Sequence, residues 1–448
     1  MRGCRSRGVG LTRSLLVLLA VLLVSPAAKA LGPRVVQSQL AAGATLLVSE
    51  QHNLPLVVVQ VVLDAGARSD PPEHAGLANL TSELLTEGTT SRSAAAISEA
   101  IDSIGASLDA STDTDYAVVS LRVLKQDLEI GLKLMADVLL HPVFAEAELT
   151  RRREAVLAQI RAEKDDPTQV AQKAFQAALF GAEPYGHPVE GTETSVPRIS
   201  RSDVRAFFER HYGPAGATVV MVGDITAAEA SASLERVLGG WRGGSDAAAA
   251  PPAATVPSAQ ALRIDKPVTQ AGIILGHRGV ARNNPDYEAL SVMNYILGGG
   301  GFSSRLVDSI RTQAGLAYSV ASFFTVNKWP GSFLVVMQTK NPSVGDAIGR
   351  ARAELERIRT QPVSDDELTE AKRYLTGSFP LRLDSNGKIA QFIGQVWFYG
   401  LGLDYADKYL QRVSAVTKED VQRVAQQYLH PEALVEVIVA DLAQTALP

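Results

Sequence analysis

The sequence repeats itself once, and the two copies are offset by about 217 residues. Residues 199–204 (ISRSDV) match residues 416–421 (VTKEDV), and Pro214 matches Pro431 at the same offset. A third match, at an offset near 220, joins residues 142–149 to residues 362–368. One shared offset across scattered positions indicates duplication of a whole domain, because solenoid repeats have far shorter periods of about 20–50 residues. The 448 residues are therefore predicted to form two homologous domains.

A stretch rich in alanine and proline separates the two copies. Residues 245–261 read SDAAAAPPAATVPSAQA, with almost no charge and no periodic pattern, which is typical of a linker. We expect a first domain at residues 31–244, this linker at residues 245–261, and a second domain at residues 262–448.

Strand and helix patterns mix within each copy. β-branched or alternating segments predict strands at residues 54–63, 116–123 and 218–222. Apolar residues at helical spacing predict helices at residues 75–86, 93–104, 127–140 and 146–164. The fold class is therefore α+β, with helices packed on a sheet in each domain.

The first 30 residues form a segment of their own. Four arginines precede an apolar run at residues 15–24, and the small-x-small triplet Ala28-Lys29-Ala30 follows it. This order is typical of a cleaved export signal, so we expect a periplasmic or otherwise exported protein. An uncleaved anchor and an organellar transit peptide are the alternatives. The compact apolar run argues against the transit peptide, and it is short for a bilayer span of about 20 residues.

Charge and cysteine content exclude several classes of protein. Cys4, the only cysteine, lies inside the signal segment, so the mature chain has no disulfide and no thiol nucleophile. Removal of the signal leaves 38 basic and 48 acidic residues, a net charge of −10. This charge opposes binding to nucleic acid. We expect no membrane span after signal cleavage.

A longer motif lies at the start of the first domain. Residues 66–89 read GARSDPPEHAGLANLTSELLTEGT. This segment resembles the opening of peptidase family M16, the insulinase or pitrilysin family, in which G-S/A-R-x-E precedes G-x-A-H-F-L-E-H-M-x-F-K-G-T. The resemblance continues along nearly the whole mature chain, including residues 185–188 (YGHP) and residues 297–320 (LGGGGFSSRLVDSIRTQAGLAYSV). It implies two homologous domains, each a mostly antiparallel sheet packed with helices, that face each other across a chamber.

The metal site of this family is missing from the sequence. The family uses an inverted His-x-x-Glu-His motif, in which two histidines on one helix face bind zinc and the glutamate deprotonates water. A distal glutamate on a second helix completes the site. Matched residue by residue, these four positions hold Asn79, Ser82, Glu83 and Gln159. Amides are poor zinc ligands and Ser82 is no base near neutral pH, so the resemblance implies no metal and no cofactor in this chain.

Other catalytic constellations are absent from the sequence as well. No two of the seven histidines are three or four residues apart, and no Gly-x-Ser-x-Gly segment is present. The glycine run at residues 298–301 continues as Phe302-Ser303-Ser304 and lacks the Gly-Lys-Ser/Thr of a phosphate-binding loop. We expect this run to be a flexible loop that lines the substrate chamber, with Gly299 and Gly300 contacting substrate.

The second domain keeps the family's other active-site residues. The resemblance implies that Arg311 and Tyr318 reach across the chamber, where the arginine binds a substrate carbonyl or carboxylate and the tyrosine donates to the oxyanion. The alternative is that Arg311 caps a surface helix and Tyr318 packs in a sheet. Family members also add the substrate backbone to a sheet edge, and the matching edge here includes Ala110 and Ser111.

Three functions are compatible with this sequence. The resemblance favours the non-catalytic subunit of a heterodimeric zinc metallopeptidase, in which a homologous M16 subunit with an intact His-x-x-Glu-His motif carries zinc and cleaves unfolded peptides. An inactive scaffold or peptide-binding protein is the second hypothesis. An independent peptidase is the third, and the missing ligands argue against it.

Overall fold

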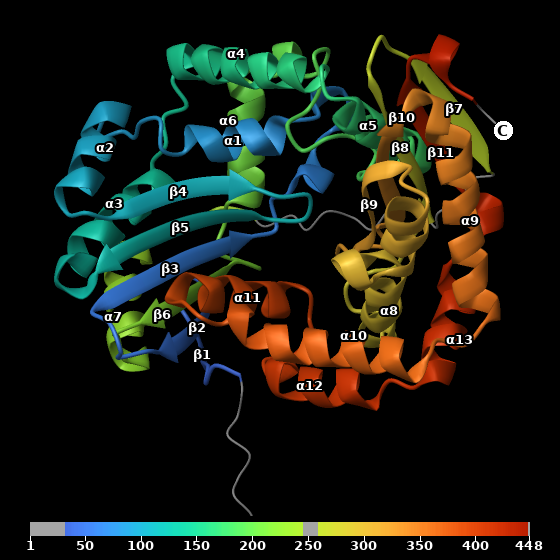
Figure 1. The fold of residues 1–448 in the computed structure, drawn as a ribbon. Helices are drawn as coiled ribbons and strands as arrows, with labels where there is room; N and C mark the ends of the chain where they lie inside the picture. Colours follow the sequence, from blue (N-terminus) through green and yellow to red (C-terminus); the bar gives the residue numbers. More distant parts are fainter. Residues whose placement is uncertain (1–31, 245–258, 447–448) are drawn as a thin grey trace, which may run out of the picture.

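The computed structural model describes residues 32–244 and 259–446, which form two lobes, each built on one β-sheet (Figure 1). The predicted signal segment and most of the predicted linker lie outside the described residues. Among the residues described, no helix combines the length and the apolar character that a bilayer crossing requires.

The first lobe contains a six-stranded sheet in the order β1-β2-β6-β3-β5-β4. Only β2 and β6 pair in parallel, and all other neighbours are antiparallel. The strands are β1 (Val36–Gln39), β2 (Thr45–Glu50), β3 (Leu56–Leu63), β4 (Ser107–Thr112), β5 (Ala117–Leu124) and β6 (Thr218–Gly223).

The second lobe contains a five-stranded sheet in the order β7-β11-β8-β10-β9, again with one parallel pair, β7 with β11. Its strands are β7 (Gln260–Asp265), β8 (Gln270–Arg278), β9 (Ala317–Thr325), β10 (Ser332–Lys340) and β11 (Val435–Ala440). This order matches the order β2-β6-β3-β5-β4 of the first lobe, strand for strand. The predicted pair of homologous α+β domains is confirmed. The last two residues of the predicted linker belong to β7.

The described part of the chain contains thirteen α-helices. The first half of the chain supplies α1 (Leu77–Leu84), α2 (Ala94–Ser103), α3 (Leu128–Leu140), α4 (Glu146–Glu163), α5 (Pro167–Phe180), α6 (Arg201–His211) and α7 (Ala227–Leu238). The second half supplies α8 (Tyr287–Asn294), α9 (Val344–Thr360), α10 (Asp365–Ser378), α11 (Asn386–Phe398), α12 (Tyr405–Ala415) and α13 (Lys418–Tyr428).

The repeated sequence motif is a helix start. Ser200 and Asp203 form a capping box at the beginning of α6, and Thr417 and Asp420 form the same box at the beginning of α13. Each side chain satisfies a backbone N–H group that the helix itself leaves without a partner. The buried strands β6 and β11 follow these two helices, which explains why the repeat extends from the capping box through an apolar run.

The two lobes exchange one helix each. Phe175 and Leu179 of α5 pack against strands of the second sheet, although α5 belongs to the first half of the chain. In return, Ile389 and Ile393 of α11 pack against Val220 and other residues of the first sheet. Figure 1 shows α11 beside β3 and α5 beside β8. The linker at residues 245–261 therefore does not mark the boundary between the two packed bodies.

A buried carboxylate joins the lobes at their junction. Asp115, in the turn before β5, accepts hydrogen bonds from Tyr185 Oη at 2.6 Å, the Lys328 backbone N–H at 2.7 Å and Tyr399 Oη at 3.1 Å. Arg68, whose side chain is fully buried, pairs with the same carboxylate at 3.3 Å. Burial raises the pKa of Asp115, and these donors offset part of that rise. One side chain thus connects segments from both halves of the chain.

Candidate functional site

Helix α1 is held at its N-terminus by a buried aspartate. Asp70 accepts hydrogen bonds from the backbone N–H groups of Gly76 and Ala78, both at 2.8 Å. Gly76 precedes the helix with a φ of +97°, and a Cβ there would lie 2.8 Å from the carbonyl oxygen of Glu190. Both constraints favour glycine at this position. The start of the family-like segment therefore fixes the position of α1 between β4 and the turn that contains Glu190.

Three of the four residues at the family's metal positions are hydrogen-bonded to one another within α1, and the fourth, Gln159, is bonded within α4. Asn79 Nδ2 donates to Glu83 Oε1 at 3.0 Å, one helical turn apart on α1. Ser82 is buried, and its hydroxyl donates to the carbonyl oxygen of Asn79 at 2.9 Å. Gln159 is exposed on α4, which packs on α1, and its amide donates to Glu163 of its own helix at 3.0 Å. Figure 1 shows α1 and α4 at the same end of the first lobe.

Zinc does not fit this donor set. Glu83 is the only anionic group among the four residues, and burial raises its pKa while the Asn79 amide lowers it in part. Its carboxylate already accepts a hydrogen bond from the Asn79 amide. That hydrogen bond would have to break before a metal ion could bind. In the described ranges, no cluster of three or more histidine, cysteine, aspartate or glutamate side chains is arranged to hold a metal ion.

In the second lobe, Arg311 and Tyr318 lie close together on the surface. Arg311 belongs to a π-helical turn, η7 (Val307–Gln313), and Tyr318 to β9; Gly315, with a φ of +64°, lies between them. The guanidinium carbon of Arg311 lies 5.8 Å from the ring centre of Tyr318 and 4.9 Å from that of Phe302. Neither Arg311 nor Tyr318 is buried, so both side chains are available to a ligand.

A β-bulge accounts for the exposure of Tyr318. Gln338 of β10 faces Ser319, whereas its neighbour Thr339 faces Ala317, so Tyr318 is the extra residue on β9. A bulge of this kind turns a side chain out of the regular alternation of the strand. As a result 74% of Tyr318 is exposed, and the alternative in which this tyrosine packs within the sheet is wrong.

The glycine run is a tight turn, where a flexible loop was expected. Helix α8 continues into a second π-helical turn, η5 (Tyr295–Gly299), and a single 3₁₀ turn, η6 (Gly301–Ser303), follows it. A Cβ on Gly298 would lie 2.5 Å from Ser322 Oγ, and one on Gly299 would lie 2.7 Å from Asn294 Nδ2. The first three glycines of the run pack closely against α8, η5 and β9. A Cβ on Gly301 would meet nothing within 4 Å, and its φ of +59° is what favours glycine there. Gly299 is nonetheless exposed, and Gly300 is half-buried.

Ala110 and Ser111 lie on β4, which is the edge strand of the first sheet next to α1. Thr112 at the end of this strand donates from its hydroxyl to the Ala78 carbonyl oxygen of α1 at 3.1 Å. Ser111 also lines a recess of about 310 Å³ between the first sheet and α11, together with polar residues such as Gln60 and Gln391. The expected edge thus exists, in the lobe opposite to Arg311 and Tyr318.

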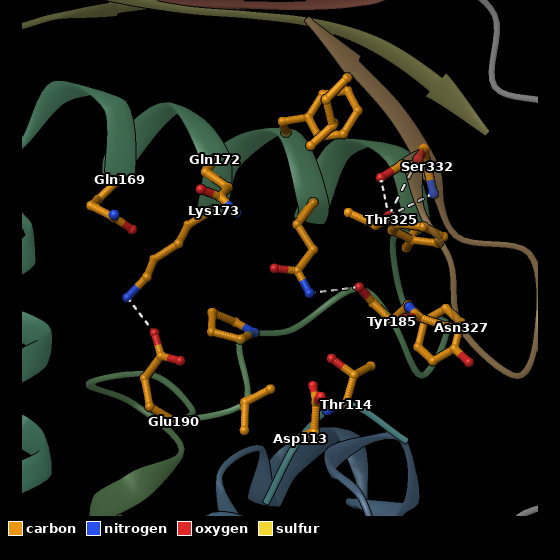
Figure 2. Close-up of a pocket in the computed structure, with 16 residues that line it drawn as sticks. Asp113, Thr114, Gln169, Gln172, Lys173, Tyr185, Glu190, Thr325, Asn327 and Ser332 are labelled. Atoms are coloured by element: carbon orange, nitrogen blue, oxygen red, sulfur yellow. Dashed lines mark hydrogen bonds and ion pairs between the residues drawn. The ribbon is translucent and has the colours of Figure 1, made fainter. Parts of the chain in front are cut away.

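A polar cavity of about 380 Å³ lies where the two lobes meet. Figure 2 shows Lys173 of α5 reaching to Glu190 of the turn that follows the Tyr-Gly-His-Pro segment. Lys173 also pairs with Glu163, so its charge is already compensated within the chain. Gln176 donates to the carbonyl oxygens of Tyr185 and His187, both at 2.9 Å. These contacts connect α5 to the turn and position the lobes.

The sequence-based candidates fall into two groups. Gly299, Gly300, Arg311 and Tyr318 lie on adjoining elements of the second lobe, whereas Ala110 and Ser111 lie in the first. Sequence reasoning missed Phe302, which stacks on Arg311 and is 77% exposed. A large apolar residue between glycines and serines was the available signal, because such a residue has no predicted core to enter.

The fold and the site together define a class of protein. Two homologous α+β lobes carry a peptidase-like helix without metal ligands and a surface pair of arginine and tyrosine. Residues 46–193 match the insulinase family, peptidase family M16, and residues 198–375 match the peptidase M16 inactive domain. The chain belongs to peptidase family M16.

Individual relatives agree with this assignment. An uncharacterized zinc protease of Streptomyces coelicolor is 31% identical over 83% of this chain and 82% of its own length. One of Mycobacterium leprae is 31% identical over 87% and 88%. The crystal structure of a peptidase M16 inactive domain from Pseudomonas fluorescens superposes with a TM-score of 0.86 at 30% identity, over 91% of this chain and 98% of that one.

Proposed function

We propose that this chain is the non-catalytic subunit of a heterodimeric M16 peptidase, exported together with a homologous subunit that carries zinc on an intact His-x-x-Glu-His motif. This chain would supply Arg311, Tyr318 and half of the substrate chamber, and the partner would hydrolyse unfolded peptides. The partner's metal chemistry lies outside this chain, whose own role is to bind and orient the peptide.

One contrast between the lobes carries the proposal. The residues at the metal positions of the first lobe are hydrogen-bonded within their own helices, whereas Arg311 and Tyr318 of the second lobe remain exposed. A bulge re-aims Tyr318, and local strand distortion of this kind is often found next to active sites. An arginine offers fixed donors to a carbonyl or carboxylate, and a phenol donates to a developing oxyanion.

Mixing two purified chains tests this proposal. The partner is the homologue from the same genome with an intact His-x-x-Glu-His motif, and the substrate is an unfolded peptide with a fluorescence reporter. We expect hydrolysis by the mixture, inhibition by a chelator, and little hydrolysis by either chain alone. Arg311→Ala or Tyr318→Phe should lower kcat by about tenfold or more, since loss of one transition-state donor costs about 10²–10³-fold in well-studied cases.

The control variant is Arg236→Ala, which removes an exposed arginine of α7 in the first lobe. Size-exclusion chromatography of each mixture shows whether the heterodimer still forms. Unchanged kcat in both the Arg311 and Tyr318 variants, with the heterodimer intact, would contradict a catalytic contribution from this chain.

A scaffold or peptide-binding protein is the second candidate. The position of β4 at a sheet edge favours it, because an extended peptide can add to such an edge without any catalytic group. If the partner alone hydrolysed peptides as fast as the mixture did, this candidate would replace the first.

A further inference from the structure

The exposed aromatic residues of the described chain all lie in one region of the second lobe. They are Phe302 (77% exposed), Tyr318 (74%), Phe323 (37%) and Tyr374 (56%). Phe302 and Tyr318 both contact Arg311, as described above. Phe323 follows Tyr318 by five residues on β9, and Tyr374 lies on α10. Aromatic side chains gathered on a surface mark binding sites more often than scattered apolar residues do.

Phe323 and Tyr374 line a pocket of about 200 Å³ between α8, the turn η5, β9 and α10. The rings of Tyr295 and Tyr374 lie 4.9 Å apart at an angle of 34° and form one wall. The other lining residues include Tyr287, Leu290, Phe324 and Leu375. The pocket is therefore mostly aromatic and aliphatic, and its volume suits a single bulky side chain.

Two polar side chains at this pocket, Asn294 and Ser291, are already hydrogen-bonded within the chain. Asn294 donates to the Ser322 carbonyl oxygen at 3.0 Å and accepts from the Ser322 hydroxyl at 2.8 Å. The hydroxyl of Ser291 donates to the Tyr287 carbonyl oxygen at 2.8 Å. The tyrosine hydroxyls are the other polar side-chain groups of the lining, and the rest of it consists of rings and aliphatic side chains. An apolar side chain that packs against these rings and aliphatic groups loses contact with water without breaking the hydrogen bonds of Asn294 and Ser291.

The pocket is adjacent to the site at Arg311 and Tyr318. Its rim includes Gly299, and the same glycine turn continues directly to Phe302. Five residues of extended chain span about 17 Å, so a peptide with its scissile bond at Tyr318 reaches Phe323 about five residues away. Because Asn294 covers the edge of β9 at Ser322, we expect the peptide to cross the glycine turn instead of pairing along the whole strand.

We propose that this aromatic pocket is a specificity subsite, which binds one bulky apolar side chain of the peptide about five residues from the bond that is cleaved. The inference rests on the proposed function and adds a substrate class to it: unfolded peptides with an aromatic or large aliphatic residue at that distance. Because Gly299 has no side chain, the rim of the pocket is low at the glycine turn, and the side chain of the peptide enters the pocket there.

Binding to the isolated chain tests the pocket itself. The probe is a pair of labelled peptides that differ only by Phe or Ser at one position, measured by fluorescence anisotropy. We expect the Phe peptide to bind about tenfold more tightly, as for burial of one aromatic side chain. Tyr374→Ala, which opens the wall, and Ser291→Phe, which fills the pocket, should each remove this preference. Leu381→Ala, at an exposed leucine outside the pocket, should keep it.

Kinetics of the mixture separate this inference from the proposed function. With the partner present, Tyr374→Ala should raise KM for the Phe peptide and leave kcat unchanged. Hydrolysis without any preference between the two peptides would contradict the subsite and would still support the proposed heterodimer. A clear Phe preference of the isolated chain, together with no hydrolysis by any mixture, would support the subsite and refute the proposed function.

Discussion

At the scale of single residues, four positions decide whether the first lobe can hold a metal. The helix that carries them is intact: Asn79 and Glu83 still face each other across one turn at 3.0 Å. Only the side-chain chemistry has changed, because an amide and a single carboxylate replace two imidazoles. The helix therefore places Asn79 and Glu83 on one face, and it is their side chains that do not suit a metal.

This geometry predicts that a metal site can be restored. The triple variant Asn79→His, Glu83→His, Gln159→Glu should bind about one zinc ion per chain, because histidines at i and i+4 on one helix face are a common zinc pair. The wild-type chain should retain only traces of zinc after dialysis. Metal analysis by mass spectrometry measures both, with Gln159→Glu alone as the control. Stoichiometric zinc in the wild-type protein would contradict the assignment of this lobe as metal-free.

At the scale of elements, the segment that carries Phe302 and Arg311 is anchored to α10. Arg305 forms two hydrogen bonds with Glu367, at 2.6 and 2.9 Å, and its side chain is only 7% exposed. Glu367 also closes the capping box that begins α10. A paired, largely buried arginine of this kind holds a turn in one position. The segment that carries the exposed residues of the site is therefore held in a fixed position by this ion pair.

The anchor predicts a specific loss of stability in acid. Burial raises the pKa of Glu367, but Arg305 and the Ser364 N–H outweigh burial and hold the pKa at about 2, below the ordinary value of 4.5. A lowered carboxyl pKa stabilises the fold above pH 4.5, and that contribution is lost as the pH falls from 4.5 to 2. With allowance for solvent screening, we expect a loss of about 1–2 kcal/mol.

Urea unfolding at several pH values measures this effect. Glu367→Gln should be less stable than wild type at pH 7, and the difference should shrink as the pH falls toward 2. Glu356→Gln, at an exposed surface pair of α9, serves as the control and should follow the wild-type curve. A constant difference between Glu367→Gln and wild type across this pH range would contradict the anchoring role.

At the scale of the whole molecule, the two lobes are bound together by exchanged helices. Ile393 of α11 is 1% exposed and lies against the first sheet, although it comes from the second half of the chain. Asp115 adds a buried polar connection between the halves. A chamber wall built in this way keeps its shape, because neither lobe can move without uncovering an apolar sheet face.

The packing of α11 on the opposite lobe predicts which lobe a core mutation destabilises. Ile393→Ala should destabilise the protein by about 2–4 kcal/mol, as for other large-to-small core substitutions. Hydrogen–deuterium exchange should rise in β3 and β6 of the first lobe. Ile348→Ala, at an equally buried residue of α9, should instead raise exchange in the second lobe. Increased exchange confined to the second lobe in both variants would contradict the packing of α11 on the first sheet.

The sequence by itself determined the two-domain α+β architecture, through its internal repeat, and the residue types at the four metal positions. Each capping box, at Ser200 and at Thr417, involves residues only three positions apart along the chain. The identities of Asn79 and Gln159 are likewise read from the chain without knowledge of the fold. Local patterns of this kind can be read directly from sequence.

Only the tertiary structure decided which surfaces meet. Helices α5 and α11 were not predicted, and nothing in their own sequence says that each covers the other lobe's sheet. The exposure of Tyr318 depends on a bulge, and the aromatic pocket combines Phe323 with Tyr374, which lie 51 residues apart. These features depend on contacts between distant segments, and periodicity along the chain carries no information about such contacts.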